Sequence, residues 1–341
     1  SGILAMDVKD RPAKASQSVG LGLAGASVSV SQPVGESLGL HVSGNRSFTG
    51  VLFAVNGRGD EFDVAPQGWD GNAVVAWDYA PDGRLKWISF GRSNRIGVES
   101  AQGVYDGLFE SSSTNQLHAL NAMQQVGVWT LEATAAWNRF EDRRSFGALQ
   151  TRPVDATWTL RLDARRSAVW GLGPEWTLQT GVVLEHERYR FRGQFPSQPD
   201  VVDPSAPVVT VDETVRDRRT GGYVQLATTL FDPLTLTAGV RTDAYSLTND
   251  IVVDPRASAR LRLGAATSLR LAWGRYHQGL DLEEAGQQVE THSLRPASAQ
   301  HLVAGMEVDR DPLLFRMEGY WKPYDDLLVR TGPQTYANAG T

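Results

Sequence analysis

Histidines and carboxylates are the residue types in this chain that could bind a metal or transfer protons. The chain has six histidines: His41, His118, His186, His277, His292 and His301. The two nearest neighbours, His292 and His301, are too far apart to form a typical ligand pair. One Gly-x-Ser-x-Gly stretch occurs, at residues 35–39, but it overlaps a predicted tight turn and runs into a predicted strand, so it is no nucleophile elbow, which leads from a strand into a helix. Cysteine is absent, which excludes disulfides and thiolate chemistry. The sequence therefore predicts no enzyme activity, no metal site and no cofactor.

Composition leaves both a soluble and a membrane location open. The chain has 341 residues and a formal net charge of −6, with its 33 lysines and arginines spread along its length. This spread argues against a nucleic-acid partner. No apolar run reaches the roughly 18–20 residues of a membrane helix. A membrane β-strand, however, needs only about 9–11 residues, with every second one apolar.

The stretch PLTLTAGVRTDAY, residues 233–245, shows this alternation. Leu234, Leu236, Ala238 and Val240 fall on one face of an extended chain, whereas Thr235, Thr237, Arg241 and Asp243 fall on the other. The same period of two recurs along the chain and predicts about 14 strands and no helix. Within residues 18–31 the alternation changes phase near Gly25, which we interpret as a bulge.

The connections between these strands are of two kinds. Tight turns are predicted at 33–36, 81–83, 126–128, 171–175, 231–234, 264–267 and 309–312, and longer polar loops at 47–68, 95–113, 193–213 and 278–297. A β-propeller would place four strands in each period of about 40–45 residues, whereas here each period holds two. Alternation of short turns with long loops is typical of an up-and-down outer-membrane barrel.

A soluble sandwich and a membrane barrel differ in the face that meets the protein interior. The apolar face packs the core of a sandwich, whereas in a barrel the apolar face meets lipid and the polar face lines the lumen. Two features favour lipid contact. The strands are longer than the five or six residues usual in globular sheets, and tryptophans lie near strand ends, as in interfacial aromatic girdles. These are Trp129, Trp137, Trp158, Trp176, Trp273 and Trp321. The predicted fold class is an all-β, transmembrane, antiparallel up-and-down β-barrel.

Four stretches resemble a known family when taken in order. They are SGILAMDVKDRP (1–12), residues 223–245, residues 254–279 with their Gly-Arg-Tyr-His-Gln ending, and residues 294–328 with a Glu-x-Tyr-x-Lys strand; TYANAGT (335–341) follows. This series is similar to the TonB-dependent outer-membrane receptors, which hold an N-terminal plug inside a 22-stranded barrel. The match is carried by residues 223–341 and by the plug-like start.

The resemblance implies a division of the chain. Residues 1–14 would be the C-terminal end of the plug domain, with Asp7, Lys9 and Asp10 near the junction, and residues 15–341 would be a barrel incomplete at its C-terminus. About 14 of the expected 22 strands would be present. Since open strand edges are not tolerated in a bilayer, the chain would be either an internal piece of a longer receptor or a smaller closed barrel.

The resemblance also implies site residues at the loop-proximal strand ends. The expected ligand-binding residues are Trp69, Arg275, Tyr276, His277 and Gln278. Three arginines, Arg256, Arg260 and Arg262, would face the lumen and pair with plug carboxylates. Charged groups are predicted in loops at 59–63 and 281–286 and at strand ends at 141–144 and 215–219. They are interpreted as solvated charge and lipopolysaccharide contacts, with an entry surface for a cation or chelate as the alternative.

The expected function is that of a receptor in the outer membrane of a Gram-negative bacterium. It would take up a scarce solute, such as a ferric siderophore, cobalamin, a glycan or a peptide, with energy from the inner-membrane TonB complex. Its other partners would be outer-membrane lipid and lipopolysaccharide. Two alternatives remain: a passive porin-like channel of about 14–16 strands, in which residues 1–12 form a barrel strand, and a soluble β-sheet binding protein.

Overall fold

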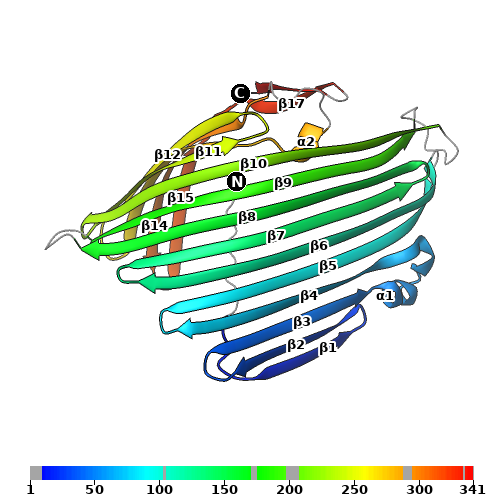
Figure 1. Cartoon of the computed structure of the whole chain (residues 1–341), viewed down its shortest axis with the longest axis horizontal. Coiled ribbons are helices and arrows are strands. Elements are labelled where there is room, and N and C mark those ends of the chain that lie inside the picture. Colours follow the sequence, from blue (N-terminus) through cyan, green and yellow to red (C-terminus); the bar gives the residue numbers. More distant parts are fainter. Residues whose placement is uncertain are drawn as a thin grey trace. The chain divides into compact units, whose positions relative to one another are not determined.

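A computed structural model describes residues 10–102, 105–169, 175–196, 207–286, 294–332 and 335–340. In this part of the chain almost every element is a strand (Figure 1). The strands are β1 (Ser16–Gly22), β2 (Gly25–Val34), β3 (Leu38–Phe48), β4 (Phe62–Ala80), β5 (Gly83–Gln102), β6 (Tyr105–Val126), β7 (Trp129–Phe146), β8 (Leu149–Val169), β9 (Glu175–Pro196), β10 (Val208–Phe231), β11 (Leu234–Tyr245), β12 (Asp250–Arg262), β13 (Thr267–Gln278), β14 (Ala297–Arg310), β15 (Leu313–Trp321), β16 (Tyr324–Asp325), β17 (Leu327–Gly332) and β18 (Thr335–Gly340). The short helices are α1 (Gly50–Val55), η1 (Gly59–Glu61) and α2 (Leu282–Gly286).

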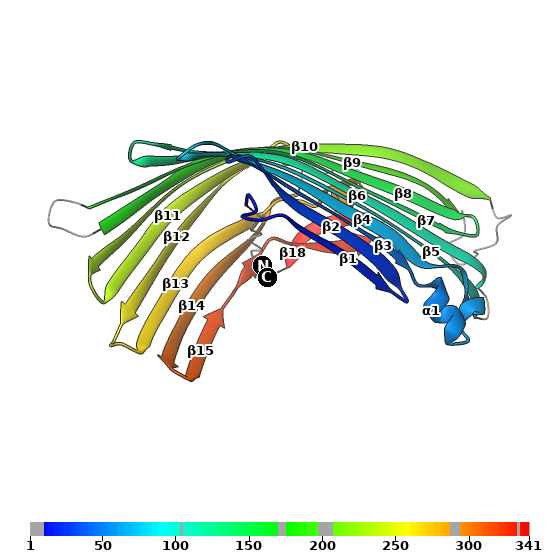
Figure 2. The ribbon, with the colours of Figure 1, turned by 90° about the horizontal axis from the view of Figure 1, so that it is seen from below.

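The strands from β1 to β15 are hydrogen-bonded in chain order within one sheet, and β16 pairs with β14 (Figure 1 and Figure 2). β17 and β18 form a separate two-stranded sheet. Neighbouring strands pair in antiparallel orientation, for example β10 with β11 and β13 with β14. The predicted up-and-down β architecture is therefore confirmed.

Two compact units make up the chain. The first comprises Ser1–Met123, Thr134–Trp158 and Glu187–Val215, and the second comprises Gln124–Ala133, Thr159–His186 and Arg216–Thr341. β6 to β10 each contribute residues to both units.

Several local predictions need correction. Residues 18–31 form two strands joined by a turn at 23–24 rather than one bulged strand, and β16, β17 and β18 were not predicted, so the count of about 14 strands is low. Most of the loop predicted at 95–113 belongs to β5 and β6. The charged runs at 141–144 and 215–219 lie inside β7 and β10 rather than at their ends. The predicted absence of helix is wrong at α1 and α2.

Most of the predicted tight turns are confirmed. They lie at or next to the joins between consecutive strands, at 33–36, 81–83, 126–128, 231–234, 264–267 and 309–312. The turn predicted at 171–175 lies almost wholly outside the described residues.

Within the described residues, no helix is long and apolar enough to cross a membrane.

The apolar face of the strands is exposed. In the second unit, Leu226, Val240 and Leu271 leave 47%, 38% and 53% of their surface uncovered. On the opposite face, Asp243 and Asp254 are each only 2% exposed. A soluble sandwich would bury the first set and expose the second. Exposed apolar and buried polar side chains are the pattern expected when one face meets lipid.

In the first unit, the chain before β1 lies on the polar face of β3, β4 and β5. Asp10 accepts bonds from Arg84 at 2.8 Å and from Lys86 at 2.6 Å, and Arg11 pairs with Asp78 at 3.4 Å. These partners flank the tight turn between β4 and β5. Residues 10–12 are thus held near the tight-turn end of the sheet. The prediction that residues 1–14 end a plug domain stays a prediction, since residues 1–9 lie outside the described part.

Gly39 on β3 permits this approach. A Cβ atom at Gly39 would stand 2.6 Å from Pro12 Cδ and 2.8 Å from Arg11 Cα, whereas one at Gly44 on the same strand would have its nearest neighbour at 3.9 Å. We expect Gly39→Val to detach residues 10–12 and to leave the sheet intact, whereas Gly44→Val should not. Amide hydrogen exchange over residues 10–16 measures the difference, and equal exchange in both variants would contradict this packing.

The contact of Asp10 should also depend on pH. The hydrogen bond from Lys86, together with the charges of Lys86 and Arg84, outweighs burial and holds the pKa of Asp10 below its usual value of 3.8. A carboxyl with a lowered folded pKa stabilises its contact at pH values above the usual pKa, and the contribution is lost as the pH falls through the folded pKa. We expect the protection of the residue 10–16 amides, measured relative to their intrinsic exchange rates, to stay high from neutral pH down to about pH 4 and to fall below that. The Lys86→Ala variant should move this loss of protection to higher pH.

Candidate functional site

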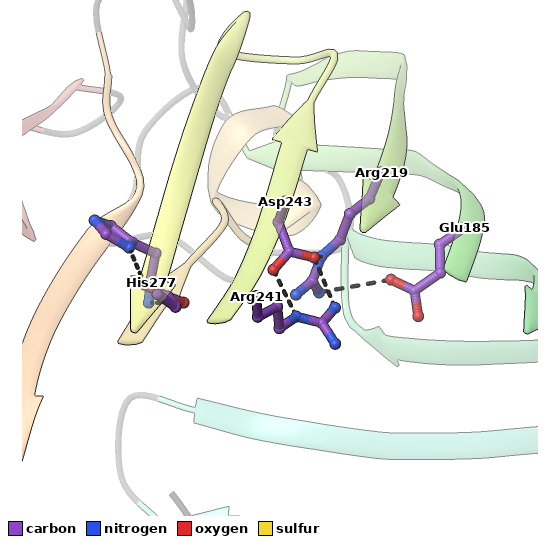
Figure 3. Close-up of polar contacts among 6 residues, drawn as sticks. Glu185, Arg219, Arg241, Asp243 and His277 are labelled. Carbon is purple, nitrogen blue, oxygen red and sulfur yellow. Dashed lines mark hydrogen bonds and ion pairs between the residues drawn. The ribbon is translucent and has the colours of Figure 1, made fainter. Parts of the chain in front are cut away.

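A cluster of charged side chains lies on the polar face of the second unit, around Asp243 of β11 (Figure 3). Arg241 donates two hydrogen bonds to the Asp243 carboxylate, each of 2.6 Å, and Arg219 of β10 donates a third at 3.2 Å. Glu185 of β9 pairs with Arg219 at 3.5 Å. Three neighbouring strands therefore contribute to one network around a carboxylate that is almost fully buried.

Strand geometry and one glycine explain how this network fits. Arg241 and Asp243 are two residues apart, so their side chains leave β11 on the same face. Gly221 of β10 pairs directly with Asp243 in the register. A Cβ atom at Gly221 would stand 2.4 Å from Asp243 Oδ1 and 2.9 Å from an Arg241 nitrogen. The position therefore requires glycine because of the close approach of the carboxylate.

Two arginines of this face lie over tyrosine rings. The Arg219 guanidinium lies 5.3 Å from the Tyr245 ring centroid, and that of Arg256 lies 4.4 Å from the Tyr276 centroid. Tyr276 also contacts the ring of His301, with centroids 4.6 Å apart. Both tyrosines lie near the strand ends farthest from the tight turns at 231–234 and 264–267. The Tyr245 ring is buried, at 4% exposed, so only the second pair, with an exposed Arg256 and a half-buried Tyr276, offers a surface that can hold an anionic, aromatic molecule.

Asp254 of β12 and His277 of β13 form a second buried pair. The Asp254 carboxylate lies 2.6 Å from His277 Nδ1 and accepts a 3.1 Å bond from the His277 backbone N–H. The side chains are 3% and 9% exposed. The β12–β13 ladder ends at the pair of Arg256 and Gly274. Just beyond this pair, the Asp254 carboxylate accepts the hydrogen bond of the His277 backbone N–H in place of a carbonyl oxygen of the ladder. This contact fixes the end of β13.

The predicted ligand-binding residues separate into two groups. Tyr276 belongs to the polar-face contacts described above, and His277 to the buried pair with Asp254. Arg275 lies two residues from Trp273 on β13 and therefore shares its exposed, apolar face. It pairs in register with Gln300. Gln278 closes β13 opposite Ala297. Trp69, in the first unit, is an even number of residues from Trp77 along an unbroken register, so both side chains lie on the same, apolar face. Trp69 also lies next to Gly91.

The three arginines predicted to face the lumen lie on the polar face of β12, alternating with Ala257, Ala259 and Leu261. Arg256 contacts Tyr276, Arg260 pairs in register with Arg270, and Arg262 donates to the backbone oxygen of Asp232 at 2.5 Å. Their pairing with plug carboxylates stays a prediction.

Sequence reasoning missed Glu185 and the roles of Arg219 and Asp254 in these networks. The alternation of Arg241, Asp243 and Tyr245 was visible in residues 233–245, but their partners on other strands depend on register. Within the part of the chain that the structure describes, no group of three or more histidine and acidic side chains could hold a metal ion.

A model of the family described as "TonB dependent receptor-like, beta-barrel" matches residues 44–341. A comparison with curated protein sequences found no match.

Solved structures share the fold at low sequence identity. The siderophore receptor PiuA from Acinetobacter baumannii has a TM-score of 0.73 at 11% identity, covering 97% of this chain and 60% of that one. The ferric enterobactin receptor of Pseudomonas aeruginosa, in a mutant form in complex with enterobactin, has a TM-score of 0.69 at 12% identity, covering 94% and 55%. The siderophore receptor PirA from Pseudomonas aeruginosa has a TM-score of 0.65 at 15% identity, covering 95% and 59%.

The chain thus spans between 55% and 60% of the length of these structures. The family consists of receptors and transporters rather than enzymes. The family match confirms the resemblance inferred from the sequence and its assignment to the outer membrane of a Gram-negative bacterium. This chain belongs to the TonB-dependent receptor-like β-barrel family.

Proposed function

We propose that this chain forms part of a receptor for the energy-coupled uptake of a ferric siderophore across the outer membrane. The observation that carries the ligand class is the arginine–tyrosine contact of Arg256 with Tyr276 on the polar face. Siderophore receptors among the structures of the same fold support the same choice. An anionic iron chelate with aromatic groups would find both charge and stacking surface there.

The residues of the polar face would have different roles in uptake. Arg256 and Tyr276 would contact the ligand directly, and Gln278 would extend that surface toward the loop. Asp254 would act as a positioning residue, because it holds the His277 end of β13. Asp243 would hold Arg219 and Arg241 in fixed orientations. Arg260 and Arg262 would face the plug, and the TonB complex would drive its movement.

Uptake in the cell that produces this chain tests the proposal. Under iron limitation, we expect uptake of radioactive iron supplied as ferric enterobactin, and we expect a protonophore to abolish it. Arg256→Ala should weaken the uptake at least about tenfold, which corresponds to one lost charge-assisted contact. Arg310→Ala, an exposed arginine at the tight-turn end of β14, is the control and should have little effect.

Other outcomes would contradict the proposal. Uptake of cobalamin, a glycan or a peptide in place of the iron chelate would assign another ligand. Uptake that a protonophore leaves unchanged would indicate a passive channel. An equal loss in both variants would mean that the arginine–tyrosine contact does not bind the ligand.

A further inference from the structure

The chain that follows β13 folds back over the polar face of β11. Gly279 lies against the ring of Tyr245 at the end of β11, because a Cβ atom at Gly279 would stand 2.5 Å from Tyr245 Cε1. In the sheet, β12 lies between β11 and β13, so the chain crosses β12 to make this contact. Tyr245 is two residues from Asp243 and shares its face. We call residues 279–286, which end with α2, the strap.

Apolar side chains hold the strap against the second unit. Leu282 and Ala285 of α2 are only 1% and 3% exposed, and Leu294, farther along the chain, is 4% exposed. Residues three apart lie on one side of a helix, so one side of α2 is buried. The turn itself is fixed by Asp281, whose side chain accepts a 2.8 Å bond from the Glu283 N–H and whose backbone oxygen accepts one of 2.9 Å from the Ala285 N–H.

The strap covers an arginine–tyrosine pair. The Tyr245 ring has the Arg219 guanidinium 5.3 Å from its centroid and is 4% exposed. Its hydroxyl is buried and makes no hydrogen bond within the described residues. A buried hydroxyl without a partner is destabilising. The strap therefore hides a pair of the same chemistry as Arg256 with Tyr276, and it does so without satisfying the tyrosine hydroxyl.

The charge of the strap opposes its own docking. It carries Asp281, Glu283 and Glu284 and no lysine or arginine. Burial, together with the charges of Asp281 and Glu283, raises the pKa of Glu284 above its usual value, so the charged carboxylate is disfavoured where the docked strap places it. An anionic molecule that approached the arginines of this face would repel the strap further. Apolar contacts thus hold an acidic segment that a bound anion would help to release.

The preceding end of β13 is fixed independently of the strap. The Asp254 carboxylate holds His277 through its ring Nδ1 at 2.6 Å and its backbone N–H at 3.1 Å. The strap begins two residues later, at Gly279. It can therefore leave Tyr245 by rotation of the backbone beyond residue 278, while Tyr276 keeps its place on β13.

We propose that the strap is an autoinhibitory contact, which covers Tyr245 in the unliganded receptor and is displaced when an anionic, aromatic chelate binds. The chelate would first contact Arg256 and Tyr276. Displacement of the strap then exposes Arg219 and Tyr245, which complete the ligand site. This inference rests on the proposed function. It differs from a lid that closes over its ligand, because such a lid would be held more firmly with the ligand than without it.

Titration of the purified chain with ferric enterobactin tests the competition. A receptor whose competent state is only partly populated binds with an affinity reduced by that fraction. We therefore expect Gly279→Val, whose side chain would clash with the Tyr245 ring, to bind at least about tenfold more tightly than the parent. The matched control is Gly264→Val in the turn before β13, where a Cβ atom would meet nothing within 4 Å, and its affinity should be unchanged. Adding Tyr245→Ala to Gly279→Val should remove most of the gain.

Amide hydrogen exchange in the parent gives the direction of the movement. Binding of ferric enterobactin should speed exchange in residues 280–286 and leave residues 274–278 slow. Slower exchange in residues 280–286 with the ligand would indicate closure and overturn the proposal. Equal affinities of Gly279→Val and Gly264→Val would overturn it as well, and a gain in affinity is not an effect that a misfolded variant produces.

A further measurement needs no ligand. Nitration by tetranitromethane, followed by mass spectrometry, should modify Tyr245 faster in Gly279→Val than in the parent or in Gly264→Val. Equal nitration rates in the three forms would show that the strap does not cover Tyr245 and would overturn the proposal. If ferric enterobactin bound to none of these forms, the proposed function would fail, whereas the nitration rates would still decide whether the strap covers Tyr245.

Discussion

Replacing Asp243 by asparagine should lower the free energy of unfolding by about 3 kcal/mol, the cost of removing one partner from a buried ion pair. The Asp243 side chain is 3% exposed and accepts three hydrogen bonds from Arg241 and Arg219. Asparagine keeps the volume but removes the charge and replaces one acceptor oxygen by a donor. Two guanidinium groups would then face each other on the polar face with only Glu185 to neutralise them.

Urea unfolding of the protein in lipid vesicles, followed by tryptophan fluorescence, measures this loss. Asp309→Asn provides the matched control, since Asp309 is an exposed residue at the end of β14, and its unfolding midpoint should shift little. Equal midpoints for the parent and the Asp243→Asn variant would show that the network does not stabilise the sheet.

Replacing Asp254 by alanine should have the second largest effect, about 2–3 kcal/mol, because two hydrogen bonds are lost and buried donors are left without an acceptor. His277 would lose the partners of both its ring Nδ1 and its backbone N–H. The end of β13 should then loosen, and binding of the iron chelate should weaken together with stability.

Hydrogen exchange and ligand titration separate these effects. We expect faster exchange in residues 274–278 of the Asp254→Ala variant and slow exchange in β11. A variant that exchanges as the parent does, and binds ferric enterobactin equally well, would remove Asp254 from its positioning role.

Local patterns in the sequence were sufficient to predict much of the fold. Turn residues such as those at 81–83 act over a few positions, so the joins between strands could be placed. Alternation identified the two faces of β11 because neighbouring side chains on a strand point to opposite sides. Residues 95–113 were read as a loop because they are polar and contain glycine. The strands there continue past the apolar band, where both faces are polar and the alternation disappears.

The candidate site was only partly predictable for a different reason. The side chains around Asp243 come from three strands, and which residues of β9 and β10 face it depends on register. Trp69 shows a second reason why site residues could not all be predicted from the sequence. Its place near a loop suggested a ligand contact, but its register with β3 puts it on the face of Trp77. A residue type and a loop-proximal position do not determine the face.

The central claim is that the apolar face of these strands meets lipid and the polar face lines the lumen. Because the chain contains no cysteine, single cysteines can be placed one at a time along residues 234–245 and spin-labelled in the protein in its membrane. The account predicts that accessibility to lipid-soluble oxygen peaks at Leu236, Ala238 and Val240, and that a water-soluble relaxation agent reaches Thr237 and Gly239 instead. Accessibility without a period of two, or oxygen peaks at the polar positions, would contradict it.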